Sequence, residues 1–79
     1  MINRFKGFLK SKIDYKELLS GNEIEIISLI AKGKSNKEIG IEQNYSEGTI
    51  KNKVSKVFEK LKVTDRMQVA IFAIENGII

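Results

Sequence analysis

"SNKEIGIEQNYSEGTIKNKVSKVFEKL", residues 35–61, contains two candidate helices separated by a short turn. Ser35 and Glu38 have the spacing of a capping box, in which the serine hydroxyl accepts a hydrogen bond from the third helical N–H and the glutamate reaches back to the serine N–H. Ser46 can cap a second, longer helix that continues to the end of the stretch. A short helix, a tight turn and a longer helix are the layout of a helix-turn-helix.

Similar signals occur on both sides of this stretch. Ser20 and Glu23 have the spacing of another capping box, ahead of an apolar helix that Gly33 can end. A last helix is predicted from about residue 65 to residue 76. The sequence has no proline and no sustained alternation of polar and apolar residues, so we predict an all-α fold. The expected architecture is a compact four-helix helix-turn-helix domain over residues 19–79.

Residues 1–18 form a basic segment ahead of that domain, which we predict to be an additional helical or linker segment. Five basic and two acidic residues occur in it, and residues 14–19 are expected to be a connection. Its apolar residues share one broad side of a helix: Ile2, Phe5, Phe8, Leu9 and Ile13. That side can pack onto the domain, which is the favoured interpretation, or lie on an anionic lipid surface.

Composition excludes several classes of function. The chain of 79 residues has no cysteine and no histidine, so it offers neither a thiolate nor an imidazole for catalysis or metal binding. We therefore expect no enzyme activity, no cofactor, no metal and no small-molecule substrate. No apolar run approaches the roughly 20 residues that cross a bilayer, and the N-terminus lacks the apolar core of a signal peptide. A cytoplasmic protein without a membrane partner is expected.

The charge balance favours an anionic partner. The net charge is +4 and the sequence pI is about 9.4. A positive protein attracts nucleic acid or an anionic membrane surface over a distance. A net charge this small is only weak support for either partner.

The helix at residues 46–61 separates into an apolar and a polar face at 100° per residue. The apolar residues lie within one arc: Ile50, Val54, Val57, Leu61 and, beside them, Phe58. In the helix that begins after Ser20, the expected inward residues are Ile24, Ile27, Ile30 and Ala31. These positions predict the core.

The opposite face of the same helix has the residue types that read DNA. Asn52 can pair with adenine, Ser55 can donate or accept, and a lysine such as Lys56 can reach guanine. Lys51 and Lys53 lie on the two shoulders of this ridge. Lys60 lies farther along and is expected to face only solvent. The competing interpretation is an ordinary solvated face, since acidic residues occur on the same helix.

A family resemblance favours the first interpretation. It is carried by "LSGNEIEIISLIAKGKSNKEIG", residues 19–40, and "YSEGTIKNKVSKVFEKLKVTDRMQVAIFAIENGII", residues 45–79. These stretches resemble the LuxR-type helix-turn-helix domain of bacterial transcription regulators, also called the GerE-like or NarL/FixJ output domain. The resemblance implies a four-helix fold whose third helix enters the major groove of DNA, commonly in a dimer.

The resemblance and the helical geometry together give candidate contacts. Those for DNA bases are Lys51, Asn52, Ser55 and Lys56, although the resemblance places Lys56 closer to the groove wall. Those for the DNA backbone are Ser35, Asn36, Lys37, Ser46, Thr49 and Lys53. The free N–H groups in the first turn after Ser46 also suit a phosphate.

Several residues depart from the family pattern. The family usually has arginine at Asn22, alanine at Gly40, leucine at Gln43, histidine or tyrosine at Lys53, and glycine at Lys62. A glycine inside a helix costs about 0.5–1 kcal/mol relative to alanine. An amide at residue 43 replaces a side chain that normally packs. The first helix of the motif is therefore expected to be weakly held or slightly rotated.

The last helix is apolar on two sides, which indicates two burial surfaces. One side has Met67, Ala70, Ile71 and Ile74, and the other has Val69, Phe72 and Ala73. One side must face the core of the domain. The other is expected to face a second copy of the chain, or else the N-terminal segment. The candidate dimer contacts are Val69, Phe72 and Ala73.

The predicted function is sequence-specific binding of double-stranded DNA in transcription regulation, as a homodimer, with RNA polymerase as a further candidate partner. The alternative is a divergent helix-turn-helix module that binds another regulator or a polymerase subunit. Gly40 and Gln43 favour that alternative, because they put the placement of the motif in doubt. The chain is expected to be either a free-standing regulator or an excised output domain.

Overall fold

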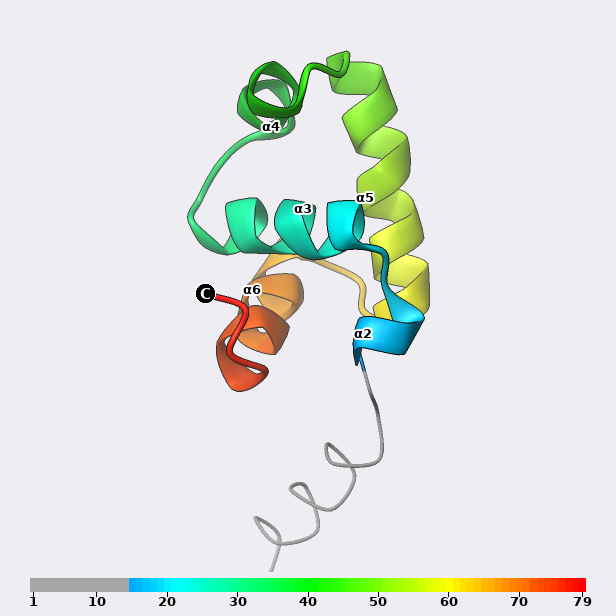
Figure 1. Cartoon of the computed structure of the whole chain (residues 1–79), viewed down its shortest axis with the longest axis vertical. Coiled ribbons are helices and arrows are strands. Elements are labelled where there is room, and N and C mark those ends of the chain that lie inside the picture. Colours follow the sequence, from blue (N-terminus) through cyan, green and yellow to red (C-terminus); the bar gives the residue numbers. More distant parts are fainter. Residues whose placement is uncertain (1–14) are drawn as a thin grey trace, which may run out of the picture.

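The computed structural model describes residues 15–79, and within this range every regular element is a helix (Figure 1). The helices are α2 (Tyr15–Leu18), α3 (Gly21–Ala31), α4 (Asn36–Gln43), α5 (Glu47–Leu61) and α6 (Arg66–Glu75). The predicted all-α fold is confirmed, and α3 to α6 are the four expected helices. The single turn of α2 lies where only a connection was predicted. The prediction for the residues before it lies outside the described residues.

Side-chain caps begin the helices, as the sequence predicts. The Ser20 and Ser35 hydroxyls each accept from the N–H three residues later, and both capping boxes are complete. Ser46 caps α5 by accepting from the N–H of Thr49 at 3.1 Å. At α6, Asp65 accepts from the third helical N–H. These caps satisfy backbone donors that the first helical turn leaves without a partner.

Left-handed residues follow four of the helices. Gly33, after α3, has φ of 87°, and Gly77, after α6, has φ of 69°. The residues that follow α4 and α5 are not glycine: Asn44 has φ of 63° and Lys62 has φ of 56°. Asparagine tolerates this conformation better than most residues, whereas lysine is strained in it. The family usually has glycine at residue 62, and the left-handed conformation of this residue explains that preference.

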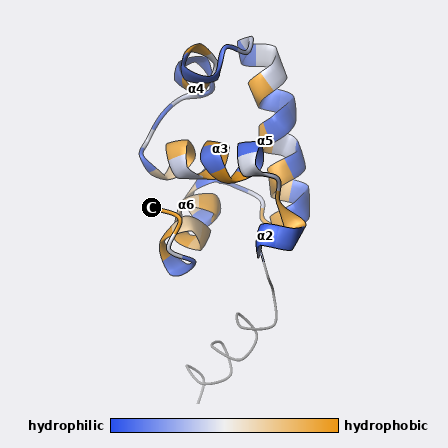
Figure 2. Cartoon of the chain, in the orientation of Figure 1, coloured by the Kyte–Doolittle hydropathy of each residue, from blue (hydrophilic) through white to orange (hydrophobic). Residues whose placement is uncertain are grey.

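The core lies where α3 meets α5 and α6. Figure 2 shows α5 alternating between hydrophobic and hydrophilic along its length, as an amphipathic helix does. The buried apolar residues are Leu19, Ile26, Ile27, Leu29, Ile30, Ile39, Ile50, Val54, Val57, Val69 and Ala73. The predicted core face of α5 is confirmed.

The inward face of α3 differs from the prediction. Ile26 and Leu29 are buried, whereas Ile24 and Ala31, both predicted as inward, are only half-buried. The physical reason is that α3 packs against α5 on one side and α6 on another. A helix between two neighbours buries a wider arc than the single stripe that periodicity predicts.

The structure corrects the predicted dimer face of α6. Val69 and Ala73 are fully buried within this chain because their side of α6 packs against α3. Phe72 is half-buried and meets the Tyr15 ring edge-on, with the ring centroids 6.1 Å apart. The apolar residues of α6 that stay exposed are Met67 at 73%, Ile71 at 48% and Ile74 at 67%.

Two further findings concern residues 15–79. No helix among them is long and apolar enough to cross a membrane. No group of acidic, cysteine or histidine side chains in the same range could hold a metal ion.

Candidate nucleic-acid interface

The outer side of α5 is an uninterrupted polar surface. Lys51, Asn52, Ser55 and Lys56 are all exposed. Ile50, Val54 and Val57 occupy the opposite side of the helix and are buried. The buried side fixes the rotation of α5 about its own axis. The polar residues are therefore presented together, as the candidate base-contacting set requires.

The first turn of α5 holds a small hydroxyl network. The Ser46 hydroxyl donates to Thr49 Oγ1 at 2.9 Å and its oxygen accepts from the Thr49 N–H. Ser46 is therefore engaged in the cap itself. Within residues 15–79 the Thr49 hydroxyl hydrogen has no acceptor, so it can donate to a phosphate oxygen.

Lys53 stacks on the turn that precedes its helix. Its Nζ lies over the Tyr45 ring, 4.7 Å from the ring centroid. A lysine ammonium is attracted to an aromatic face by the quadrupole of the ring. Lys53 is only partly exposed, whereas Lys51 and Lys56 are exposed. The contact fixes a positive charge at the junction of the turn and α5.

A hollow of about 370 Å³ lies between the start of α3 and the outer side of α5. Its lining residues are Ser20, Asn22, Glu23, Tyr45, Thr49, Asn52, Lys53 and Lys56. Four predicted contact residues of α5 thus border one depression. The predicted contacts at the start of α4 do not line this hollow.

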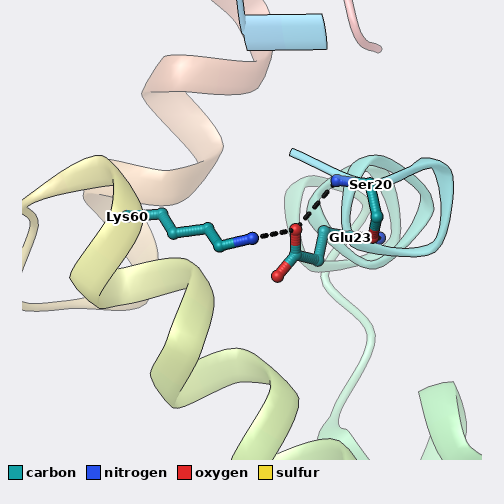
Figure 3. Close-up of polar contacts among 3 residues, drawn as sticks. All are labelled: Ser20, Glu23 and Lys60. Atoms are coloured by element: carbon teal, nitrogen blue, oxygen red, sulfur yellow. Dashed lines mark hydrogen bonds and ion pairs between the residues drawn. The ribbon is translucent and has the colours of Figure 1, made fainter. Parts of the chain in front are cut away.

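The prediction that Lys60 faces only solvent is wrong, because its side chain forms an ion pair with Glu23. Its Nζ donates to Glu23 Oε1 at 2.8 Å, and the Ser20 N–H donates to the same oxygen at 2.9 Å (Figure 3). The Glu23 side chain is 11% exposed and the Lys60 side chain 38%. The pair joins the first turn of α3 to the last turn of α5.

The environment keeps Glu23 ionised. Burial by itself raises the pKa of this carboxyl, but the hydrogen bonds from Lys60 and from the Ser20 backbone, together with the Lys60 charge, lower the pKa below its ordinary 4.5. A buried carboxylate needs such partners because the apolar surroundings disfavour its charge. The buried charge is therefore compensated within the domain.

The start of α4 is fixed by an arginine from α6. Arg66 Nη1 donates to Asn36 Oδ1 at 2.7 Å, and Arg66 Nη2 donates to the Lys34 carbonyl at 2.7 Å. Lys37, the next residue of α4, is exposed, as is the capping Ser35. The three predicted backbone contacts of α4 are thus brought together at one helix end.

An acidic residue lies in the same turn. The Ser35 backbone N–H donates to Glu38, and this bond, followed by the bond with the Ser35 side chain, lowers the pKa of the Glu38 carboxyl. Glu38 is therefore negative at neutral pH. Its negative charge repels an approaching phosphate and so offsets part of the attraction of Lys37.

Gly40 is predicted from the sequence to weaken α4, but the structure shows a reason for glycine at this position. A Cβ added at this residue would lie 2.5 Å from the Tyr45 carbonyl oxygen. The Tyr45 N–H also donates to the Gly40 carbonyl at 2.9 Å. The turn between α4 and α5 therefore passes directly over residue 40. Glycine permits a backbone approach that a side chain would block.

Gln43 also has partners that the sequence did not reveal. Asn22 Nδ2 donates to Gln43 Oε1 at 3.0 Å, and Gln43 Nε2 donates to Glu25 Oε1 at 3.1 Å. Two departures from the family pattern, at residues 22 and 43, thus contact each other across α3 and α4. The amide holds the end of α4 by hydrogen bonds where a leucine would hold it by packing.

Sequence reasoning missed the contacts of Arg66 with α4, the contact of Tyr45 with Lys53, and the ion pair of Glu23 with Lys60. Arg66 alone carried a usable signal, because the chain has twelve lysines and only two arginines. Arginine offers a planar fork of donors that lysine lacks, so an arginine in a lysine-rich chain indicates a site with that geometry.

Known proteins resemble this chain in sequence and in structure. The family described as "GerE: Bacterial regulatory proteins, luxR family" matches residues 17–73. "Response regulator protein VraR" of Staphylococcus aureus is 37% identical over 76 residues, which cover 96% of this chain and 36% of that protein. Proteins of the same name from Staphylococcus saprophyticus and Staphylococcus epidermidis match equally well. The chain thus spans about a third of the length of these curated relatives.

A solved structure of the transcription factor GerE has the same fold. It superposes with a TM-score of 0.69 at 36% sequence identity and covers 77% of this chain and 91% of that chain.

Proposed function

The chain belongs to the luxR family of bacterial regulatory proteins, and from this premise we propose that it binds double-stranded DNA as the output domain of a transcription regulator. The observation that carries the proposal is the polar outer side of α5. Asn52 and Ser55 are exposed on it beside exposed lysines, while buried residues hold the opposite side. The proposed activity is binding rather than catalysis.

In the proposed complex, α5 lies in the major groove. Asn52 and Ser55 meet base edges, with Lys51 and Lys56 on either side. An asparagine amide matches the donor and acceptor of adenine, and a lysine matches the acceptors of guanine. These residues supply sequence preference, because base edges differ between sequences and phosphates do not.

Backbone contacts come from the first half of α5 and from the start of α4. Thr49 and Lys53 supply them in α5. Ser35, Asn36 and Lys37 supply them at the start of α4. The exposed N–H groups of a helix start and its positive dipole end favour a phosphate. These contacts fix the register of α5 on the duplex.

We further propose a homodimer through the exposed side of α6, formed by Met67, Ile71 and Ile74. Large apolar side chains at 73%, 48% and 67% exposure form a surface that a second copy can cover. This face replaces the originally expected one, which is buried in the domain. Two copies would read half-sites about 34 Å apart, so a near-palindromic operator is expected.

The curated relatives are called response regulators, and the proposed setting of this domain follows from that name. The site of action is the bacterial cytoplasm, where transcription takes place, and RNA polymerase is a further proposed partner. The alternative of a protein-interaction module loses its main support. Gly40 and Gln43, which had placed the motif in doubt, both have defined roles in holding it.

The first test is selection of bound sequences from a pool of random duplexes, followed by comparison of Asn52→Ala with Lys53→Ala. Asn52→Ala should lower affinity for the selected sequence by about 1–3 kcal/mol and relax the preference at one or two base positions. Lys53→Ala should weaken binding to all duplexes about equally and flatten the dependence of affinity on salt. Affinity is measured by fluorescence anisotropy at several salt concentrations.

The reverse behaviour of the two variants would contradict the assignment of α5. A pool in which no sequence is enriched at moderate salt would favour the protein-interaction module.

A further inference from the structure

The helix α4 has little apolar surface to hold it in place. Only Ile39 and Gly40 are buried among its residues, and glycine contributes no side chain. α5, in contrast, is held by a full stripe of buried residues. Contacts at the ends of α4 therefore add to its packing against α5 in fixing its position.

Arg66 makes two hydrogen bonds at the N-terminal end of α4. One nitrogen of its guanidinium donates to the Asn36 side chain and another to the Lys34 carbonyl, both at 2.7 Å. The guanidinium is planar and carries donors only, so it holds two acceptors in a fixed relative geometry. Arg66 is the first residue of α6, thirty positions away from Asn36 in the sequence.

The contact determines which way the Asn36 amide faces. An amide has one oxygen, which accepts, and one NH₂ group, which donates. A guanidinium offers no acceptor, so the NH₂ group cannot take the place of Oδ1 beside Arg66. The NH₂ group is therefore directed away from Arg66. Among residues 15–79 this group has no hydrogen-bond partner.

We propose that Arg66 is a positioning residue for DNA binding, which orients the Asn36 amide so that its NH₂ group faces a backbone phosphate. Phosphate oxygens only accept hydrogen bonds, so the amide is useful to DNA in this orientation and not in the reverse one. This inference rests on the proposed function, and specifically on the contact between α4 and the DNA backbone. It differs from direct phosphate binding by Arg66, because its effect passes through Asn36.

The test is a double-mutant cycle on DNA affinity with the full 79-residue chain. Arg66→Lys keeps the positive charge but removes the fork, and Asn36→Ala removes the amide. We expect each single variant to lose roughly 3- to 10-fold in affinity for a duplex selected by the wild-type chain. The double variant should lose no more than Asn36→Ala alone. The salt dependence of Arg66→Lys should match that of the wild type, because the charge is unchanged.

A matched control is Gln43→Ala, which loosens the other end of α4 without touching Asn36. Its loss should multiply with that of Asn36→Ala. If the losses of Arg66→Lys and Asn36→Ala also multiply, Arg66 acts independently of Asn36 and the inference is wrong.

A second measurement does not depend on DNA. In the free chain, the side-chain NH₂ signals of Asn36 in an NMR spectrum should move in Arg66→Lys, while those of Gln43 stay in place. Unmoved Asn36 signals would overturn the orientation argument. A wild-type chain that binds no duplex would contradict the proposed function and this inference together, whereas binding with multiplying losses contradicts this inference alone.

Discussion

The two helices of the motif, α4 and α5, begin alike and are held differently. Each has a serine cap and each is followed by a left-handed residue that is not glycine. α5 is held by a buried apolar stripe, whereas α4 is held at its ends by side chains from α3 and α6. The comparison teaches that one small motif can contain a helix placed by a long buried stripe and another whose smaller buried surface is supplemented by polar contacts at both ends.

The largest expected effect tests the close approach at α4. Gly40→Ala should destabilise the domain by about 1–3 kcal/mol, because the new methyl group would meet the Tyr45 carbonyl oxygen. The usual gain in helix propensity, about 0.5–1 kcal/mol, offsets only part of this cost. Chemical denaturation measures the free energy of unfolding.

The matched control for this change is in α5. Gly48→Ala adds the same methyl group at a residue with nothing within 4 Å and should stabilise by about 0.5–1 kcal/mol. Equal stabilisation by both alanines would mean that the turn between the helices moves freely.

A smaller effect is expected where α5 makes its own polar contact. Lys60→Met removes the partner of the buried Glu23 carboxylate and should destabilise by about 1 kcal/mol at neutral pH, since Lys60 is partly exposed. Lys56→Met is the control, because it removes the same charge from an exposed side chain. Little difference between the two variants would show that the ion pair contributes nothing.

The effect of Lys60→Met should depend on pH. The pKa of Glu23 is lower in the folded chain than its ordinary 4.5, so its contribution to stability is present above about pH 4.5 and is lost as pH falls through the folded value. In Lys60→Met the pKa of Glu23 is higher, because the hydrogen bond and the charge of Lys60 no longer lower it. The variant therefore lacks the part of the stability that the wild type loses on acidification. Denaturation at a series of pH values should therefore show the two chains converging below pH 4.5. A constant difference across that range would contradict the pairing.

The smallest expected effect compares how the two helices end. Lys62→Gly should stabilise the domain by about 0.5–1 kcal/mol, because glycine adopts the left-handed conformation without strain. Asn44→Gly should change stability by less, since asparagine already tolerates that conformation. Thermal melting of both variants measures the difference. A larger gain in stability from Asn44→Gly than from Lys62→Gly would show that Asn44, and not Lys62, is the more strained residue.

The sequence predicts those parts of the fold that depend on neighbouring residues. Capping boxes, glycine ends and the buried face of α5 all arise within a few positions, so spacing reveals them. Partners that are distant in the sequence are not revealed in this way. Lys60 and Glu23 are 37 positions apart, Arg66 and Asn36 30 apart, and Gln43 and Asn22 21 apart.

The candidate site follows the same division. Periodicity places the exposed residues of α5 on one side, because the buried stripe of the same helix fixes its rotation. It does not show that a backbone turn covers Gly40, since that depends on how two helices meet. Periodicity also did not show which side of α6 faces the core, and the predicted dimer contacts Val69 and Ala73 are in fact buried in the domain.

The contact of Lys53 with Tyr45 has a practical consequence for spectroscopy. The chain has no tryptophan and two tyrosines, so tyrosine emission can be recorded without interference. Tyr45 lies under a lysine ammonium at the proposed DNA surface, while Tyr15 packs edge-on against Phe72. Replacing either tyrosine with phenylalanine leaves the fluorescence of the other tyrosine as the only tyrosine emission. The molecule thus carries one optical reporter beside the motif and a second one in the packing between α2 and α6.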